Sequence, residues 1–432
     1  MFLLYDLILT LATLVLLPYY LLRGVRHGKV RRGIRERLGF FPAERLAPLA
    51  ARPVIWVHAV SVGETRAAVP LIKALKTRYP NHAILLSNVT ETGHGVARGL
   101  RDVDLCLFFP FDLSWVVRRV FSAVKPQLAV IVETEIWPNF VRQCQRRQIP
   151  VLLVNGRISD RSFPRYRRVR WLLQPVLRRF SAFCMQSDLD AERIIAMGAT
   201  AERVEVTRNL KFDMQARTPD VKELASLRQT FRLGGGAQVW VAGSTHAGEE
   251  EAVALAFAEL LAAGESLVLV LVPRHPERCR SVAEMLASRG LPVTLRSRIS
   301  DRGSDLQGGE VLLVDSIGEM MSFYALADLV FVGGSLVNIG GHNILEASLL
   351  KKPVVFGPYM QNFKEISRLL IEANGGVCVA DESELAPTVG RLLADAELRQ
   401  SMGEGGYALL AENAGATDHT LRVVARALGV QG

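Results

Sequence analysis

The sequence has few cysteines, and no two of them are close together in the chain. Its five cysteines are odd in number and far apart in the chain: Cys106, Cys144, Cys184, Cys279 and Cys378. No C-x-x-C pair occurs, so the sequence predicts neither a disulfide framework nor a cysteine-based structural metal site. A reducing compartment such as the cytoplasm is the simple inference.

Several motifs of nucleotide-dependent and hydrolytic proteins are also missing. The chain has no Walker loop, no G-x-S-x-G elbow, no zinc-ligand spacing and no short internal repeat. The glycine run at 234–236 is typical of a flexible loop rather than of a dinucleotide fingerprint. No RNA-binding motif with interleaved aromatic residues occurs, so we expect no nucleic-acid partner.

Acidic residues are scarce in two stretches of this basic chain, whose formal net charge is +9. Residues 23–37 are rich in Lys and Arg, and Glu36 is the only acid among them. Because this cluster directly follows an apolar stretch, it predicts contact with an anionic membrane surface. A second cluster at 161–179 is typical either of a site for a phosphorylated acceptor or of a solvated helix face.

The apolar stretch at residues 1–22 has Asp6 as its only charge. About twenty apolar residues can cross a bilayer as one helix. The basic residues follow the stretch and no cleavage site is visible, so it does not read as a secretory signal. We predict an N-terminal membrane anchor with the rest of the chain in the cytoplasm. Asp6 and Pro18 leave a helix lying in the membrane interface as the alternative.

From Pro53 onward, short apolar runs alternate with helix-like segments. This alternation predicts an α/β fold with parallel sheets and helices on both faces, and the length of 432 residues indicates two domains. Residues 214–220 read as the linker, and 417–428 as a terminal helix. Strands are expected at 53–59, 83–86, 105–108, 128–132, 151–154, 238–242, 267–272, 311–314, 329–332 and 353–356.

Carboxylates follow two of the strands in the first half. Glu64 lies at the helix start after residues 53–59. Two interpretations stay open: an ordinary carboxylate in the first turn of a helix, or a general base that faces the cleft. Glu133 and Glu135 follow residues 128–132 on the same side of the chain, and we favour Glu133 as the functional one. The alternative is a solvated turn. Possible acceptor contacts in neighbouring loops are Ser61, Gly63, Arg157 and Arg161.

The second half is organised around residues 329–363. An apolar strand run ends at Gly333-Gly334, and Gly340-Gly341 precedes a helix expected to open at His342-Asn343. A strand, a glycine loop and a helix start form a typical phosphate site. Asn343 and Glu346 would share one face of the first turn, where a carboxylate suits a ribose diol.

Other strand ends in the second half carry polar groups that fit a nucleotide. Arg274 and His275 could bind a phosphate or a base edge, unless this is only a turn held by two prolines. The helix start at Ile317, Gly318 and Glu319 could meet a cytosine ring. Possible contacts to phosphate or sugar are Ser244, Thr245, His246, Gln361 and Asn362.

In this order, these motifs resemble the Kdo transferases, GT-B glycosyltransferases that move 3-deoxy-D-manno-octulosonic acid (Kdo) from CMP-Kdo onto lipid A precursor. The resemblance implies two Rossmann-like domains facing a cleft. It divides the chain into an anchor (1–22), an acceptor domain (23–215), a CMP-Kdo domain (216–405) and a C-terminal helix that crosses back (406–432). The implied location is the cytoplasmic side of the inner membrane.

The resemblance also implies roles for individual residues. Residues 58–64 (HAVSVGE) are similar to the family motif that carries the catalytic base, here Glu64. Glu133 matches a second essential acid, and Lys211 a lysine that stabilises the transition state. The implied contacts to CMP are Arg274, His275, Ile317, Gly318, Glu319, Asn343, Ile344, Leu345 and Glu346.

The expected reaction is a single displacement with inversion. Neither donor region has an acidic D-x-D cluster at a strand end, so we expect no catalytic metal and no cofactor besides the donor substrate CMP-Kdo. Two alternatives stay open: a GT-B lipid glycosyltransferase for another nucleotide sugar, and a non-catalytic membrane-tethered scaffold that binds nucleotides.

Overall fold

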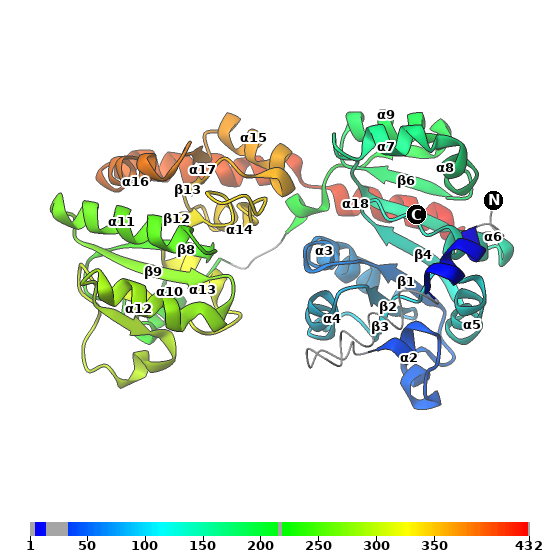
Figure 1. Cartoon of the computed structure of the whole chain (residues 1–432), viewed down its shortest axis with the longest axis horizontal. Helices are drawn as coiled ribbons and strands as arrows, with labels where there is room; N and C mark the ends of the chain where they lie inside the picture. Colours follow the sequence, from blue (N-terminus) through cyan, green and yellow to red (C-terminus); the bar gives the residue numbers. More distant parts are fainter. Residues whose placement is uncertain (1–4, 14–32, 215–217, 431–432) are drawn as a thin grey trace. The chain divides into compact units, whose positions relative to one another are not determined.

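The computed structural model describes residues 5–13, 33–214 and 218–430 (Figure 1). The chain forms two compact α/β units. The first unit comprises Met1–Met214 and Asn413–Gly432, and the second comprises Gln215–Glu412. Most of the predicted anchor, much of the first basic cluster and residues 215–217 of the predicted linker lie outside the described residues.

The first unit contains a parallel sheet in the order β3-β2-β1-β4-β5-β6-β7. Its strands are continuous apolar runs because helices cover both faces. The strands are β1 (Val54–His58), β2 (Ala83–Asn88), β3 (Leu105–Phe108), β4 (Pro126–Val132), β5 (Val151–Gly156), β6 (Ala182–Met185) and β7 (Val204–Val206). The helices are α2 (Ile34–Arg37), α3 (Val62–Arg78), α4 (Glu91–Arg98), α5 (Ser114–Val124), α6 (Pro138–Arg146), α7 (Phe163–Arg168), α8 (Arg170–Leu177), α9 (Asp188–Met197) and α18 (Ala416–Leu428).

Alternate residues of β1 enter two separate cores. Val54 and Trp56 pack in a core with α5, α6, α8 and α9. Ile55 and Val57 pack in the opposite core with α3, α4 and the C-terminal helix α18. The period of two residues along a strand therefore places helices on both faces of this sheet, as the sequence predicted.

The second unit repeats this architecture in the order β10-β11-β9-β8-β12-β13-β14, again with all pairs parallel. Its strands are β8 (Gln238–Thr245), β9 (Leu267–Pro273), β10 (Val293–Leu295), β11 (Val311–Leu313), β12 (Leu329–Val332), β13 (Val354–Phe356) and β14 (Gly376–Cys378). The helices are α10 (Val221–Thr230), α11 (Glu249–Ala262), α12 (Cys279–Ser288), α13 (Met320–Leu326), α14 (Leu345–Ser348), α15 (Lys364–Glu372), α16 (Leu385–Ala394) and α17 (Ala396–Asn413).

Each sheet has one point where the chain reverses its direction of travel across the sheet. In the first unit this point lies between β1 and β4, and in the second between β8 and β12. The connections leave such a point in opposite directions, so a crevice opens beyond the carboxyl ends of the two strands. We call these two places the first and second switch points.

All strands expected from the sequence are present, several of them longer than expected. The prediction missed β6, β7, β10 and β14. One detail was wrong: α14 begins at Leu345 rather than at His342-Asn343. Asn343 therefore precedes the helix, and its Oδ1 accepts a hydrogen bond from Leu345 N at 3.3 Å. The prediction was therefore wrong that Asn343 and Glu346 share one face of a first helical turn.

The described part of the predicted anchor, residues 5–13, is helical and contacts the first unit through polar groups. The Asp6 carboxylate accepts hydrogen bonds from Ser114 N (3.1 Å) and Asn139 Nδ2 (2.7 Å). Tyr5 donates to Asp112 at 3.0 Å. Within the part of the chain that the structure describes, no helix is both long enough and apolar enough to cross a membrane.

Candidate functional site

Glu64 lies at the first switch point, in the first turn of the helix that follows β1. Ser61 is the N-cap of α3, and its hydroxyl donates to Glu64 Oε1 at 3.1 Å. Val60 N donates to Glu64 Oε2 at 2.5 Å. These two bonds turn the side chain back over its own loop. Glu64 is 9% exposed, so its carboxylate is nearly removed from water.

Glu133 and Glu135 lie at the same switch point, directly after β4. Glu133 has φ of 60°, a left-handed conformation that non-glycine residues rarely adopt, and its N–H donates to Val154 O at 2.8 Å. Such backbone strain is concentrated at functional sites, because the surrounding structure must hold it. The strained turn leaves Glu133 and Glu135 half-buried beside Glu64.

The three carboxylates influence one another electrostatically. Burial raises the pKa of Glu64 to about 7, and the charges of Glu133 and Glu135 act in the same direction. Burial, together with Glu133, also raises the pKa of Glu135 to about 7. A carboxylate with a pKa near 7 is a far stronger base than an ordinary glutamate and is still substantially ionised at neutral pH.

Lys211 completes this group from η3 (Leu210–Asp213), a single 3₁₀ turn. Burial lowers the pKa of the Lys211 ammonium, while the charges of Glu133 and Glu64 raise it, which places all three groups in one neighbourhood. The structure therefore brings together Glu64, Glu133 and Lys211, residues separated by nearly 150 positions in the sequence.

A buried network of amide side chains fixes the turn that carries Lys211. Asn155 Oδ1, at the end of β5, accepts from Leu210 N at 3.0 Å. Gln186 donates to Asn155 O at 2.9 Å and accepts from Asn209 Nδ2 at 2.9 Å. Asn209 Oδ1 then accepts from Lys211 N at 3.0 Å. No local pattern in the sequence indicates this network, because its members come from three different strand ends.

The loop after β5 carries Arg157, one of the predicted acceptor contacts. Arg157 is half-buried, and its charge acts on Lys211. Its N–H donates to Thr134 Oγ1 at 3.1 Å, and the Thr134 hydroxyl donates to Arg157 O. The loops after β4 and β5 are thereby joined beside Glu133.

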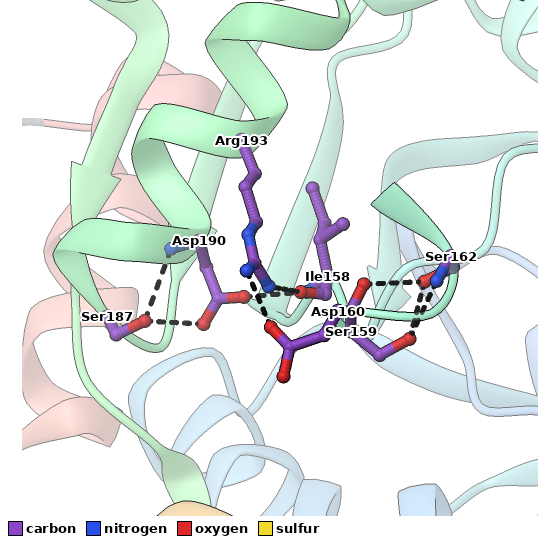
Figure 2. Close-up of polar contacts among 7 residues, drawn as sticks. All are labelled: Ile158, Ser159, Asp160, Ser162, Ser187, Asp190 and Arg193. Atoms are coloured by element: carbon purple, nitrogen blue, oxygen red, sulfur yellow. Dashed lines mark hydrogen bonds and ion pairs between the residues drawn. The ribbon is translucent and has the colours of Figure 1, made fainter. Parts of the chain in front are cut away.

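Helix α9 holds the continuation of this loop (Figure 2). Asp190 Oδ1 accepts from Ile158 N at 2.7 Å, and Ser187 donates to the other carboxylate oxygen at 2.6 Å. Arg193 donates to Ile158 O at 2.6 Å and to Asp160 at 2.6 Å. The loop leads into α7 and the second basic cluster, whose arginines at 161, 165, 167, 168 and 170 are exposed. Trp171 beside them is 70% exposed.

At the second switch point, the side chain of a glutamate binds the loop where the sequence predicted a phosphate. Glu249, the first residue of α11, is fully buried. Its carboxylate accepts four backbone N–H groups: His246 (2.9 Å), Gly334 (2.6 Å), Ser335 (2.9 Å) and Leu336 (2.9 Å). The expectation that the Gly333-Gly334 loop offers its amides to a phosphate is therefore wrong, because a resident carboxylate already binds them.

Histidines lie directly beside this loop. His246 Nε2 and His342 Nε2 are 2.9 Å apart, so one proton bridges the two rings. The His246 and His275 rings meet edge to face, with centroids 5.8 Å apart. Burial lowers the pKa of His246, while Glu249 acts in the opposite direction. The predicted residues Ser244, His246 and His275 thus lie near one another, and Ser244 adopts a left-handed φ of 59°.

The other predicted donor contacts differ in accessibility. Arg274, His275, Ile317, Gly318, Gln361 and Asn362 are exposed, and Asn343 and Glu346 are half-buried. Ile344, Leu345 and Thr245 are fully buried, so their side chains pack in the interior and only their backbone groups could meet a ligand. Glu319 is bound by Arg296 at 2.8 Å.

Three contributions were missed by the sequence reasoning: the resident carboxylate of Glu249, the Asn155–Gln186–Asn209 network and the hold of α9 on the loop after β5. Among residues 5–13, 33–214 and 218–430, no group of three or more His, Cys, Asp or Glu side chains is arranged to hold a metal ion.

Comparison with known proteins adds the following similarities. A family model described as "3-Deoxy-D-manno-octulosonic-acid transferase (kdotransferase)" matches residues 32–214. The chain is 35% identical over 419 residues to a 3-deoxy-D-manno-octulosonic acid transferase of Haemophilus influenzae, with 96% of both chains covered. It is 36% identical over 411 residues to one of Bordetella pertussis, with 91% of both covered.

Among solved structures, the chain resembles a glycosyltransferase from Rickettsia africae ESF-5. The TM-score is 0.58 at 13% identity, with 88% of this chain and 99% of that chain covered. At this identity the likeness concerns the fold: two α/β domains, each built on a parallel sheet.

Proposed function

Because the chain belongs to the 3-deoxy-D-manno-octulosonic-acid (Kdo) transferase family, and is therefore a glycosyltransferase with GT-B-like α/β domains, we propose that it moves Kdo from CMP-Kdo to a hydroxyl of lipid A precursor. The observation that carries the proposal is the group at the first switch point. There, a buried glutamate with a pKa of about 7 lies beside a second carboxylate and a lysine.

Glu64 acts as the general base in this proposal. Its carboxylate accepts the proton of the attacking hydroxyl while the acceptor oxygen forms a bond to the anomeric carbon of Kdo. The bond from that carbon to the phosphate oxygen breaks, and its electron pair leaves with CMP. One displacement of this kind inverts the anomeric configuration. Glu133 stabilises the positive charge that develops on the sugar ring, and Lys211 stabilises the negative charge of the donor.

The second unit binds the CMP moiety in this proposal. With the amides of Gly334, Ser335 and Leu336 held by Glu249, the phosphate depends on the exposed side chains of Arg274 and His275 and on His246 beside them. Glu346 is half-buried and accepts the ribose hydroxyls. No residue of this mechanism calls for a metal ion.

The first unit receives the acceptor. Ser61 and Gly63 border Glu64, and Arg157 borders Lys211. The exposed arginines that follow, Arg161 first among them, suit the phosphate groups of lipid A precursor. Residues 1–22 anchor the chain at the cytoplasmic face of the inner membrane. The described part of that stretch fits this role, since Leu7, Ile8 and Leu11 are more than half exposed while Asp6 is bound by the protein.

The test is a donor and acceptor assay with the full chain in detergent. Purified protein is incubated with tetraacylated lipid A precursor and with one donor at a time: CMP-Kdo, UDP-N-acetylglucosamine or UDP-glucose. The lipid products are identified by mass spectrometry. We expect Kdo-bearing lipid with CMP-Kdo alone, unchanged by a metal chelator. Turnover only with a UDP-sugar would establish the alternative, a GT-B lipid glycosyltransferase for another donor.

A further inference from the structure

One carboxylate of the first unit, Asp213, lies where three features of the chain meet. It is the last residue of η3, the turn that carries Lys211. It stands next to Met214, after which the chain first passes into the second unit. It also binds the start of α18, close to the place where the chain returns to the first unit at Asn413.

The bonds of Asp213 are those of a carboxylate at a helix N-terminus. Its Oδ1 accepts from Gly415 N at 2.7 Å, and its Oδ2 accepts from Thr417 N. Gly415 is the N-cap of α18 and has no side chain to satisfy these amides itself. The first amides of a helix lack partners within the helix, so a carboxylate from elsewhere in the chain both satisfies them and meets the positive end of the helix dipole.

The start of η3 is fixed by two other side chains. Asn209 and Asn155 bind the amides of Lys211 and Leu210 at the start of the turn. Leu210 is fully buried in the core that also contains Val423 and Val424 of α18. Asn155 and Asn209 hold the beginning of the turn, and Asp213 holds its end.

From these contacts we propose that Asp213 is a positioning residue for Lys211. By binding the N-terminus of α18, its carboxylate joins the two points where the chain passes between the units and fixes the turn that presents Lys211 to Glu64 and Glu133. The expected effect on catalysis rests on the proposed function, whereas the expected effect on the turn that carries Lys211 does not. It predicts that loss of the Asp213 carboxylate impairs the catalytic step through Lys211 while leaving α18 in place.

Helix α18 has enough other contacts to stay docked without Asp213. Val423 and Val424 remain in the core, and Glu205 of β7 binds His419 at 3.2 Å and also Arg426. Asp213→Ala is therefore expected to fold. Asp213→Asn keeps the shape of the side chain and one acceptor oxygen, so its effects should be smaller. The matched control is Asp220→Ala, since Asp220 also caps a helix near the linker, α10, but lies in the second unit.

The kinetic test is a double-mutant cycle with Lys211→Met. In the wild-type background we expect Asp213→Ala to lower kcat about tenfold or more, because small displacements of a catalytic group are costly. CMP affinity, measured by calorimetry, should not change. In the Lys211→Met background Asp213→Ala should add almost nothing, because it acts through Lys211. An equal loss in both backgrounds would overturn the proposal.

Hydrogen exchange provides a readout that needs no activity. In Asp213→Ala we expect faster exchange at the amides of Gly415, Thr417, Lys211 and Phe212, and unchanged exchange in the middle of α18. Asp220→Ala should leave all of these amides unchanged. If the wild-type protein failed to transfer Kdo, the proposed function would be wrong, but the exchange measurement would still test the positioning role of Asp213. Unchanged exchange at Lys211 and Phe212 would sink the positioning role itself.

Discussion

Glu64 and Glu249 occupy corresponding places in the two units: each lies in the first turn of the helix that follows the strand at the switch point. Glu64 accepts one amide and one hydroxyl, both from its own loop, and faces two further carboxylates. Glu249 accepts four amides, three of them from the loop after β12. At corresponding positions, the carboxylate of the first unit therefore has few hydrogen-bond donors and that of the second unit has many.

The difference shows how the surroundings of a carboxylate decide its use. A buried carboxylate with few hydrogen-bond donors and negative neighbours binds a proton readily, so it can serve as a base. A buried carboxylate that accepts four backbone amides instead holds the backbone around it. In the first unit the task of holding a loop falls instead to α9, through Asp190 and Arg193 (Figure 2).

The largest effect that would test this contrast is on catalysis. Glu64→Gln removes the proton acceptor and should lower kcat about a thousandfold, within the usual range for a general base. CMP binding to the second unit should be unchanged. The measurement is Kdo transfer at saturating donor and acceptor.

The control for that variant is Glu91→Gln. Glu91 is the first residue of α4, at the next strand end of the same unit, but it is exposed. It should retain full activity. Substantial transfer by Glu64→Gln would show that the base lies elsewhere.

The second effect is on the loop held by Glu249. Glu249→Gln replaces an acceptor of four N–H groups by an amide with one acceptor oxygen and should destabilise the loop by about 2–4 kcal/mol. Hydrogen exchange of Gly334, Ser335 and Leu336 should speed up accordingly, and CMP should bind more weakly. Glu251→Gln, an exposed residue in the same turn, is the control. Unchanged exchange would mean that these four bonds do not hold the loop.

A smaller effect, on stability, should have opposite signs in the two units. The pKa of Glu64 in the folded protein, about 7, lies above its ordinary value near 4.5. The folded state therefore binds the proton more tightly, and this stabilisation is present below about pH 4.5 and is lost as the pH rises through 7. At pH 8, Glu64→Gln should stabilise the first unit by about 1–3 kcal/mol, whereas Glu249→Gln destabilises the second.

Stability is best followed for each unit by the exchange of its own core amides, because a chain of two units need not unfold in a single step. At pH 4.5 the stabilisation by Glu64→Gln should disappear. A stabilisation that persisted at pH 4.5 would have another origin than the charge of Glu64.

The smallest effect concerns the pH dependence of the reaction. Transfer should rise with pH as Glu64 loses its proton, with an apparent pKa near 7. Glu135→Gln removes one of the two negative charges that raise this pKa, so the acid limb of kcat should move to lower pH. Glu251→Gln should leave the profile in place. A shift of the limb to higher pH would contradict the placement of Glu135 beside Glu64.

Much of the second unit could be predicted from local sequence, because a polar group directly after an apolar run marks the carboxyl end of a strand. His246, Arg274 and His275 were found in this way, and the structure places them near one another. The glycine loop shows the limit of this reasoning. Gly333-Gly334 looks like a phosphate site, but Glu249, which binds the amides of Gly334, Ser335 and Leu336, lies about 85 positions away in the sequence.

The sequence by itself determined the alternation of strands and helices, the two-unit division in outline and the strand ends that bear Glu64 and Glu133, because these follow from short-range periodicity. Only the tertiary structure decided which strand ends become neighbours, and hence that Glu64 keeps a raised pKa beside Glu133 while the Glu249 carboxylate is bound by four backbone amides. A pKa and the occupancy of a hydrogen-bond donor depend on groups within a few ångströms, and the strand order that brings those groups together is not written in any local stretch of the chain.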